Sequence, residues 1–213
     1  MSRRAIPIAV IVIVAGGFIM VQYWPSQNRP RETTSPPSAS EPTATLTGPE
    51  ISDPISHPKD RVTKKPLGIY VTPKNSPVQP ERFTGYHVGV DFETTEAEQN
   101  VDVPVYVLCD GLLVQKRTAT GYGGVLVQRC NLKGQDVVVI YGHVRLSSVS
   151  AVISQQLTHG QQIGLLGTGY SPETDGERKH LHLGIHKGTV ITIAGYVQNK
   201  SQVGEWLNVL DYL

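Results

Sequence analysis

The sequence has little cysteine, little phenylalanine and almost no net charge. Two of its 213 residues are cysteine and three are phenylalanine, and the 19 basic residues nearly balance the 18 acidic ones, for a net charge of +1. A nearly neutral chain gives no electrostatic indication of a polyanionic partner, so no binding of nucleic acid is expected. Two cysteines are too few for a disulfide framework or a cysteine-based zinc site. Any metal must therefore be bound by His, Asp or Glu side chains.

The two cysteines, Cys109 and Cys130, lie near the ends of two β-like runs. Neighbouring antiparallel strands would bring them together, and an oxidising compartment would then allow a disulfide. Two buried free thiols are the alternative, because a free cysteine packs as a small apolar residue. The sequence leaves both arrangements open.

One long apolar run stands near the N-terminus, where residues 5–24 form a stretch of 20 residues without a charge. As a helix it would span about 30 Å, the thickness of the hydrocarbon core of a bilayer. Arg3 and Arg4 precede it and favour a cytoplasmic N-terminus. The lack of a small-residue cleavage site favours an uncleaved anchor over a signal peptide. We therefore expect residues 1–24 to be a single-pass anchor in the cell membrane, with the rest of the chain extracytoplasmic.

The next segment, residues 25–65, contains eight of the fifteen prolines and few large aliphatic residues. Such a segment cannot bury enough apolar surface to offset the entropy lost on ordering, so it is predicted to be a disordered linker. It would act as an extended tether or as a simple spacer. Residues 66–213 are left as the folded domain.

The folded domain is predicted to be mainly β, an antiparallel sheet or sandwich, because its apolar residues come in short runs separated by glycine-rich turns. The 3.6-residue period of a helix is weak throughout. Residues 146–157 are expected to form a short helix or an irregular loop, and residues 206–213 to pack on the sheet. The β-like runs lie at residues 103–108, 111–116, 124–129, 136–144 and 180–186.

His87 and Asp91 form the first pair of candidate metal ligands. In a strand they would share one face, but a flat strand would separate them by about 13 Å, which is too far for one metal ion. Gly89 stands between them and permits a bend, because it has no Cβ. We therefore predict that the chain bends there.

His180, His182 and His186 form the second cluster, and in a strand they would also share one face. Same-face neighbours project about 6–7 Å apart, so one imidazole can bind a metal while the next acts on its water. The alternative is a polar strand edge that faces solvent. His143 follows the apolar strand at residues 137–141 and gains interest only from the other two clusters.

A catalytic zinc site has three protein ligands and leaves one position to water. His87, Asp91 and one of the pair His180 and His182 would supply such a set. The sequence has no H-E-x-x-H motif, so the general base would be a histidine, whose pKa lies near the working pH.

Taken together, these residues resemble the lysostaphin/LytM-type family of peptidoglycan metallo-endopeptidases, whose motifs are H-x3-D, a lone His after a strand, and H-x-H. The resemblance covers residues 80–190 and includes a glycine turn at residues 121–124 and a glycine-rich segment at residues 159–169. The motifs appear here in the family's order as His87/Asp91, His143 and His180/His182.

The resemblance implies a role for each of these side chains. His87, Asp91 and His182 would bind Zn²⁺, and His143 and His180 would activate the water and stabilise the tetrahedral intermediate. The implied fold is a small antiparallel β domain with a groove across it. The implied substrate is a short glycine- or D-amino-acid-containing peptide of the bacterial cell wall.

The chain departs from the family before its H-x-H motif, where residues 171–179 are longer and more charged. A loop there would lie at the rim of the groove, so Arg178 and Lys179 are predicted to bind a substrate carboxylate. Glu177 would lie beside them. The alternative is a charged, solvated loop. His186 has no fixed family role and is expected to be a bystander or to support a ligand.

Three functions are therefore compared. The first is zinc-dependent hydrolysis of peptide cross-links in peptidoglycan, with the bond that is cut left open. The second is a non-catalytic relative that regulates other cell-wall hydrolases. The third is a metal-free wall-binding β domain, which leaves the histidines unexplained. The metal content of the protein separates the third from the first two.

Overall fold

The computed structural model describes residues 51–213 of the chain. The predicted anchor and most of the predicted linker lie outside the described residues. Within residues 51–213, no helix is both long and apolar enough to span a bilayer.

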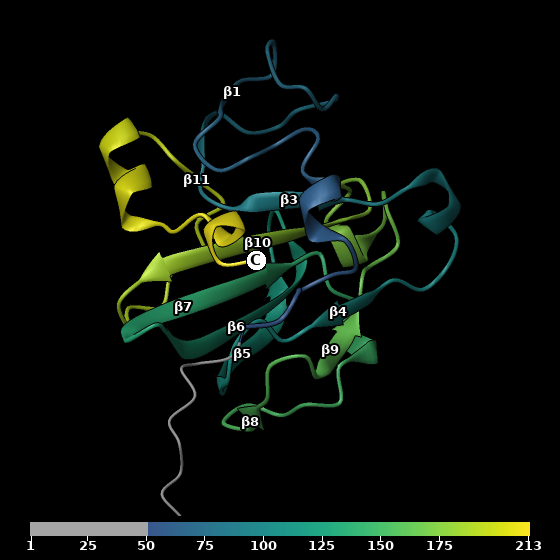
Figure 1. The fold of residues 1–213 in the computed structure, drawn as a ribbon. Coiled ribbons are helices and arrows are strands. Elements are labelled where there is room, and N and C mark those ends of the chain that lie inside the picture. The colour runs from purple at the N-terminus through teal and green to yellow at the C-terminus, as the bar shows by residue number, and fades with distance from the viewer. Residues whose placement is uncertain (1–50) are drawn as a thin grey trace, which may run out of the picture. The chain divides into compact units, whose positions relative to one another are not determined.

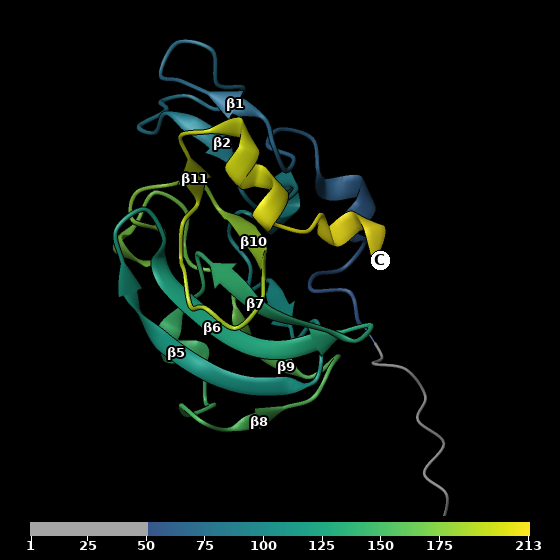
Figure 2. The ribbon, with the colours of Figure 1, turned by 90° about the vertical axis from the view of Figure 1, so that its left-hand side faces the viewer.

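The domain is built on a six-stranded sheet in which all neighbouring strands are antiparallel (Figure 1). This confirms the prediction of a mainly β, antiparallel fold. Figure 2 shows how strongly its long strands β5 and β6 curve. In spatial order the strands are β3 (Val90–Glu93), β10 (His180–Lys187), β7 (Gln135–Gly142), β6 (Gly123–Leu132), β5 (Gly111–Ala119) and β8 (Gln156–Leu157).

Two smaller sheets and several short 3₁₀ helices complete the described part of the chain. The three-stranded sheet has the order β1 (Tyr70–Val71), β2 (Gly85–His87) and β11 (Tyr196–Val197). The two-stranded sheet pairs β4 (Pro104–Tyr106) with β9 (Gln162–Leu165). The 3₁₀ helices are η1 (Pro58–Arg61), η2 (Glu96–Glu98), η3 (Leu146–Ser148), η4 (Pro172–Thr174), η5 (Lys200–Glu205) and η6 (Val209–Asp211). Residues 146–157 thus hold one 3₁₀ turn, a loop and β8.

The large sheet has an apolar layer on each face, because successive side chains of a strand point to opposite faces. Leu181, Leu183 and Ile185 of β10 belong to the larger cluster. On the other face, Ile140 of β7 packs with Trp206 in the smaller cluster. The histidines of β10 alternate with its three aliphatic residues and so point to the side of the smaller cluster.

Cys109 and Cys130 form a disulfide. The antiparallel pairing of β5 with β6 makes this possible, because it places Gly111 opposite Cys130, two residues from Cys109. The described structure thus contains the disulfide rather than two free thiols.

Residues 51–65, which composition assigns to the linker, pack against the domain. Ile51 pairs with Cys109 in an isolated bridge, and Ile55 is fully buried. Arg61 and Lys65 are buried as well, each against a glutamate. In the described structure residues 51–65 are therefore packed with the folded domain, whereas composition assigns them to the linker. Composition averaged over the segment hides the few side chains that anchor it.

Candidate metal centre

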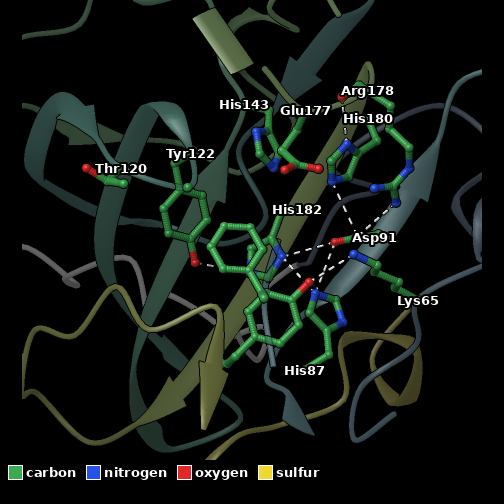
Figure 3. A pocket seen from close by; sticks show the side chains of 13 residues that line it. Lys65, His87, Asp91, Thr120, Tyr122, His143, Glu177, Arg178, His180 and His182 are labelled. Atoms are coloured by element: carbon green, nitrogen blue, oxygen red, sulfur yellow. Dashed lines mark hydrogen bonds and ion pairs between the residues drawn. The ribbon is translucent and has the colours of Figure 1, made fainter. Parts of the chain in front are cut away.

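Three stretches far apart in the sequence, residues 87–91, 142–143 and 180–182, meet beside the large sheet (Figure 3). His87 is the last residue of β2, and Asp91 lies on β3. His182 of β10 stands opposite Asp91 on one side and Gly142 of β7 on the other. His143 follows Gly142 directly, so strand pairing brings Asp91, His143 and His182 together, while His87 comes from the separate three-stranded sheet.

The predicted bend at Gly89 is present. Strand β2 ends at His87 and β3 begins at Val90, and Nε2 of His87 comes within 3.2 Å of Oδ1 of Asp91. The glycine also makes room for the third side chain, since a Cβ at residue 89 would lie 2.4 Å from Cε1 of His182. Real Cβ atoms do not approach a ring this closely, so the position of His182 depends on a glycine here.

The three predicted ligands His87, Asp91 and His182 converge on one point. Nδ1 of His182 lies 3.0 Å from Nε2 of His87 and 3.0 Å from Oδ1 of Asp91. The three residues are at most 4% exposed. Zinc–ligand bonds of about 2.0–2.1 Å in a tetrahedron place the ligand atoms roughly 3.3 Å apart. The donor types and their spacing therefore fit a zinc ion.

Each of the three side chains is oriented by a partner outside the group. His87 Nδ1 lies 3.2 Å from the carbonyl oxygen of Pro66, and donating there leaves the Nε2 lone pair facing the group. His182 Nε2 lies 3.4 Å from the Tyr122 hydroxyl, and donating there leaves its Nδ1 free. The backbone N–H of Asp91 donates to the carbonyl of Lys65. Such outer partners fix the tautomer and angle of metal ligands.

His180 and His143 lie beside the group, with ring centroids 4.2 Å apart. His180 Nδ1 lies 2.9 Å from the carbonyl oxygen of Arg178, and its Nε2 lies 3.3 Å from Oδ2 of Asp91. His143 has a left-handed backbone with φ of 62°, and its carbonyl accepts the N–H of Gly167. Within the described part of the chain, no hydrogen-bond partner contacts the buried Nδ1 of His143.

The same cavity is also lined by residues that the sequence does not indicate as candidates for the site. Lys65 donates to Glu81 at 2.5 Å and to the Tyr196 hydroxyl at 3.0 Å, and the ring of Phe83 stacks on Tyr196. Lys65 was assigned to the linker, and no motif marks the others except Tyr122, which lies in the glycine turn. The lining residues are Lys65, Phe83, His87, Asp91, Thr120, Gly121, Tyr122, His143, Glu177, Arg178, His180, His182 and Tyr196.

Burial and mutual charge set the proton affinities in this cavity. Burial alone would raise the pKa of Asp91, but electrostatic interactions with His87 and His180 and close contacts with His180 and His182 hold it well below its usual range. Burial lowers the pKa of His182 to about 4, against the opposing hydrogen bond to Asp91. Burial, helped by the charge of His180, also lowers the pKa of His143. Asp91 is therefore ionised and these two imidazoles are neutral near pH 7.

The sequence predicts that Arg178 and Lys179 bind a substrate carboxylate. In the structure their charged ends are bound to other groups of the protein. Both are buried, and their charged ends contact the protein itself. Arg178 Nη2 lies 2.9 Å from Asp91 Oδ2, whereas Lys179 Nζ donates to the carbonyls of Glu98 and Val101. A buried cation must be paired or hydrogen-bonded, and here protein groups meet that need. Binding of a substrate carboxylate by either side chain stays a prediction.

His186 lies farther along β10, away from the other histidines. Its ring meets Trp206 edge-on, with centroids 5.0 Å apart, and the backbones of the two residues form a bridge. Glu205 is its nearest acidic neighbour, at 3.8 Å.

Fold and site together define a class: an antiparallel β domain that carries a buried His-Asp-His group suited to a metal, with two more imidazoles beside it. The comparison of its sequence with protein families then places the chain. It belongs to peptidase family M23, whose family model matches residues 85–200.

Solved structures with a similar fold include the catalytic domain of the antimicrobial peptidase lysostaphin from Staphylococcus simulans. That match has 18% identity, a TM-score of 0.48, and covers 72% of this chain and 92% of that one. A structure of LytU matches with 18% identity and a TM-score of 0.47, over 71% of this chain and 83% of that chain. A structure of the complex of SpoIIIAH and SpoIIQ matches with 18% identity and a TM-score of 0.48, over 77% of this chain and 100% of that chain. No curated protein matches the chain.

Proposed function

We propose that this protein is a zinc-dependent endopeptidase that hydrolyses peptide cross-links of bacterial peptidoglycan. Membership of peptidase family M23 supports the class of reaction. The observation that carries the proposal is the convergence of three metal-binding atoms, separated by 3.0 to 3.2 Å, beside two further imidazoles. A purely structural polar cluster would have no need of three lone pairs aimed at one point.

The metal would be held by Nε2 of His87, Oδ1 of Asp91 and Nδ1 of His182. When bound, Zn²⁺ lowers the pKa of water to near 7 and polarises a peptide carbonyl. When His87 donates from Nδ1 and His182 donates from Nε2, the lone pairs of His87 Nε2 and His182 Nδ1 are free to bind the metal. Burial of the group excludes bulk water, which strengthens every charge interaction in the cavity.

His180 is the proposed general base. Its Nδ1–H donates to the carbonyl of Arg178, so its Nε2 is left to take up a proton and return it to the leaving amine. His143 is proposed to bind the substrate oxygen. Its Nδ1 has no partner among the described residues, and burial in a polar cavity without one is costly unless a ligand supplies it.

The proposal is tested with the purified full-length chain and isolated cell-wall sacculi. The wild-type chain should release soluble peptide-containing fragments, a chelator should stop the release, and added Zn²⁺ should restore it. His182→Ala should lower the rate by more than roughly 1,000-fold, since without metal the pKa of water returns to 15.7. Undiminished activity in His182→Ala would refute the assignment.

One observation favours a second candidate, a non-catalytic relative that regulates other wall hydrolases. All five side chains of the site are at most 4% exposed, so little of their surface is accessible to a peptide. A full-length chain that binds zinc, leaves sacculi intact and stimulates a second wall hydrolase would select this candidate.

We further propose that the chain is anchored in the cell membrane with its domain outside the cytoplasm. The uncharged run at residues 5–24 supports the anchor. The disulfide between Cys109 and Cys130 supports the compartment, because disulfides persist where the environment is oxidising. Fractionation should recover the chain with membranes after a high-salt wash, and recovery in the soluble fraction would contradict the anchor.

A further inference from the structure

Arg178 contacts the metal-binding group without being able to bind a metal. Its Nη2 lies 2.9 Å from Oδ2 of Asp91, and its Nε lies 2.9 Å from Oε2 of Glu93. Nη2 also donates to Oε1 of Glu93. Figure 3 shows the guanidinium reaching Asp91 from the side opposite His87.

The two oxygens of Asp91 therefore have different surroundings. Oδ1 faces His87 and His182, at 3.2 and 3.0 Å. Oδ2 faces Arg178 Nη2 at 2.9 Å and His180 Nε2 at 3.3 Å. A carboxylate can bind a metal through one oxygen or through both. The guanidinium occupies Oδ2, so it favours binding through Oδ1 alone.

Glu93 keeps the guanidinium in this position. Asp91 and Glu93 are two residues apart on β3, so their side chains share a face. Their carboxylates together neutralise a cation that would be costly to bury alone. The side chain of Arg178 is 8% exposed and that of Glu93 10%. A planar fork held along one edge by Glu93 has little freedom to turn away from Asp91.

We propose that Arg178 is a positioning residue that makes Asp91 a one-oxygen metal ligand, with Glu93 holding Arg178 in place. The inference rests on the proposed metal site and adds two residues to it. It also assigns a role to the charged segment before His180 that differs from binding a substrate carboxylate. Without Arg178, Asp91 is free to rotate and to offer both oxygens, which raises the coordination number and weakens the tetrahedral arrangement.

The test uses the full-length chain and two readouts other than activity. Zn²⁺ affinity is measured by competition with a chromophoric chelator, and the visible absorption of the Co²⁺-loaded protein reports the coordination number. Arg178→Met should weaken Zn²⁺ binding by about 10- to 100-fold, the usual effect of losing an outer partner of a ligand. Its Co²⁺ bands should weaken as the site leaves four-coordination. Glu93→Gln should change both readouts in the same direction by less.

Arg61→Met is the matched control. Arg61 is as buried as Arg178, with 8% of its side chain exposed, and it also pairs with a glutamate, Glu98. Its guanidinium contacts Glu98, the Ser56 side chain and the backbone carbonyls of Ser56 and Glu93, so it touches the backbone of Glu93 but neither the Glu93 nor the Asp91 carboxylate. This variant loses a buried ion pair of the same kind, so its stability should fall while Zn²⁺ affinity and the Co²⁺ spectrum stay unchanged.

Either of two results would overturn the inference, and each has its own pattern among the variants. If Arg178→Met and Glu93→Gln both keep the wild-type affinity and Co²⁺ spectrum, Arg178 does not position Asp91. If all three variants lose metal equally, the effect is general destabilisation. A wild-type chain that binds neither metal would instead overturn the proposed function. Should Arg178→Met fail to fold, Glu93→Gln, which keeps the shape of the side chain, decides alone.

Discussion

The two ends of strand β10 carry histidines on the same face, yet the two ends have different surroundings. At one end His180 and His182 lie beside β3, with Glu93 and Asp91 as their cross-strand partners. The pairing with β3 stops at Leu183, and at the other end His186 meets Trp206 instead. The two-residue period of the strand decides to which face the histidines point, whereas the neighbouring strand decides which side chains they contact.

The difference is also visible in the ring nitrogens. Both nitrogens of His182 have partners, Asp91 and His87 at Nδ1 and Tyr122 at Nε2. Within residues 51–213, the buried Nδ1 of His186 has no hydrogen-bond partner. His182, the proposed ligand, is thus held from both sides, while His186 is held mainly by packing against an aromatic ring.

After the loss of a metal ligand such as His182, the largest effect is expected from His180→Ala, at the same end of β10. Removing a general base lowers the rate by roughly 100- to 10,000-fold. Zinc content should remain near one ion per chain, because the three proposed ligands are untouched. Release of fragments from sacculi gives the rate, and metal analysis of the same sample gives the content. Loss of the metal would instead make His180 a ligand.

Gly89→Ala should act on the same end of the strand without touching a ligand. The new Cβ would collide with the His182 ring, so the ring must shift and Zn²⁺ affinity should fall by at least about 10-fold. Gly204→Ala is the control, since a Cβ there meets nothing within 4 Å. Chelator competition on both variants measures the effect. Equal affinities would show that the close packing of residue 89 is unimportant.

The pH dependence of stability should separate His182 from a histidine that is only packed. In the folded, metal-free chain, burial lowers the pKa of His182 to about 4. In the unfolded chain its pKa is about 6.5, so as the pH falls the unfolded chain binds the proton first. The contribution of His182 to stability is therefore fully present above pH 6.5 and falls toward pH 4, by on the order of 2 kcal/mol at pH 5. His143, whose pKa burial also lowers, adds a loss of the same sign. Asp91 does not contribute in this window, because its pKa is lowered and its contribution is lost only at lower pH.

Denaturant titrations at pH 7.5 and pH 5, with a chelator present, measure this loss. His182→Gln should lose less stability between the two pH values than the wild-type chain. The same loss in both proteins would mean that other groups cause it.

The smallest effect is expected from His186→Leu, at the other end of β10. The change removes an unpaired buried nitrogen, which is favourable, and a ring contact with Trp206, which is not. The two terms nearly cancel, so stability should stay within about 1 kcal/mol of the wild type. Zinc affinity and hydrolysis should be unchanged. A loss of either would show that the two ends of β10 are coupled.

The sequence predicted the antiparallel fold, the bend at Gly89 and the convergence of His87, Asp91 and His182. The fold and the bend follow from periods of two and glycine positions, which are local properties, whereas the choice of His182 over His180 as the third ligand comes from the resemblance to the lysostaphin/LytM-type family. The sequence did not indicate that Arg178 and Lys179 are buried, because a charged run normally faces solvent. Only the register of β10 against β3 shows that Glu93 and Asp91 lie within reach of Arg178. Lys65, Tyr122 and Tyr196 reach the cavity through tertiary packing that no local pattern encodes.

The backbone of residues 65 and 66 has a practical consequence for any shortened form of the protein. The carbonyl of Lys65 accepts the N–H of Asp91, and the carbonyl of Pro66 faces Nδ1 of His87. A fragment cut at the compositional boundary would keep every histidine and aspartate of the site. It would nevertheless lose Lys65 and the buried Ile55 and Arg61 that secure this stretch, so recombinant work should retain the chain from residue 51 or earlier.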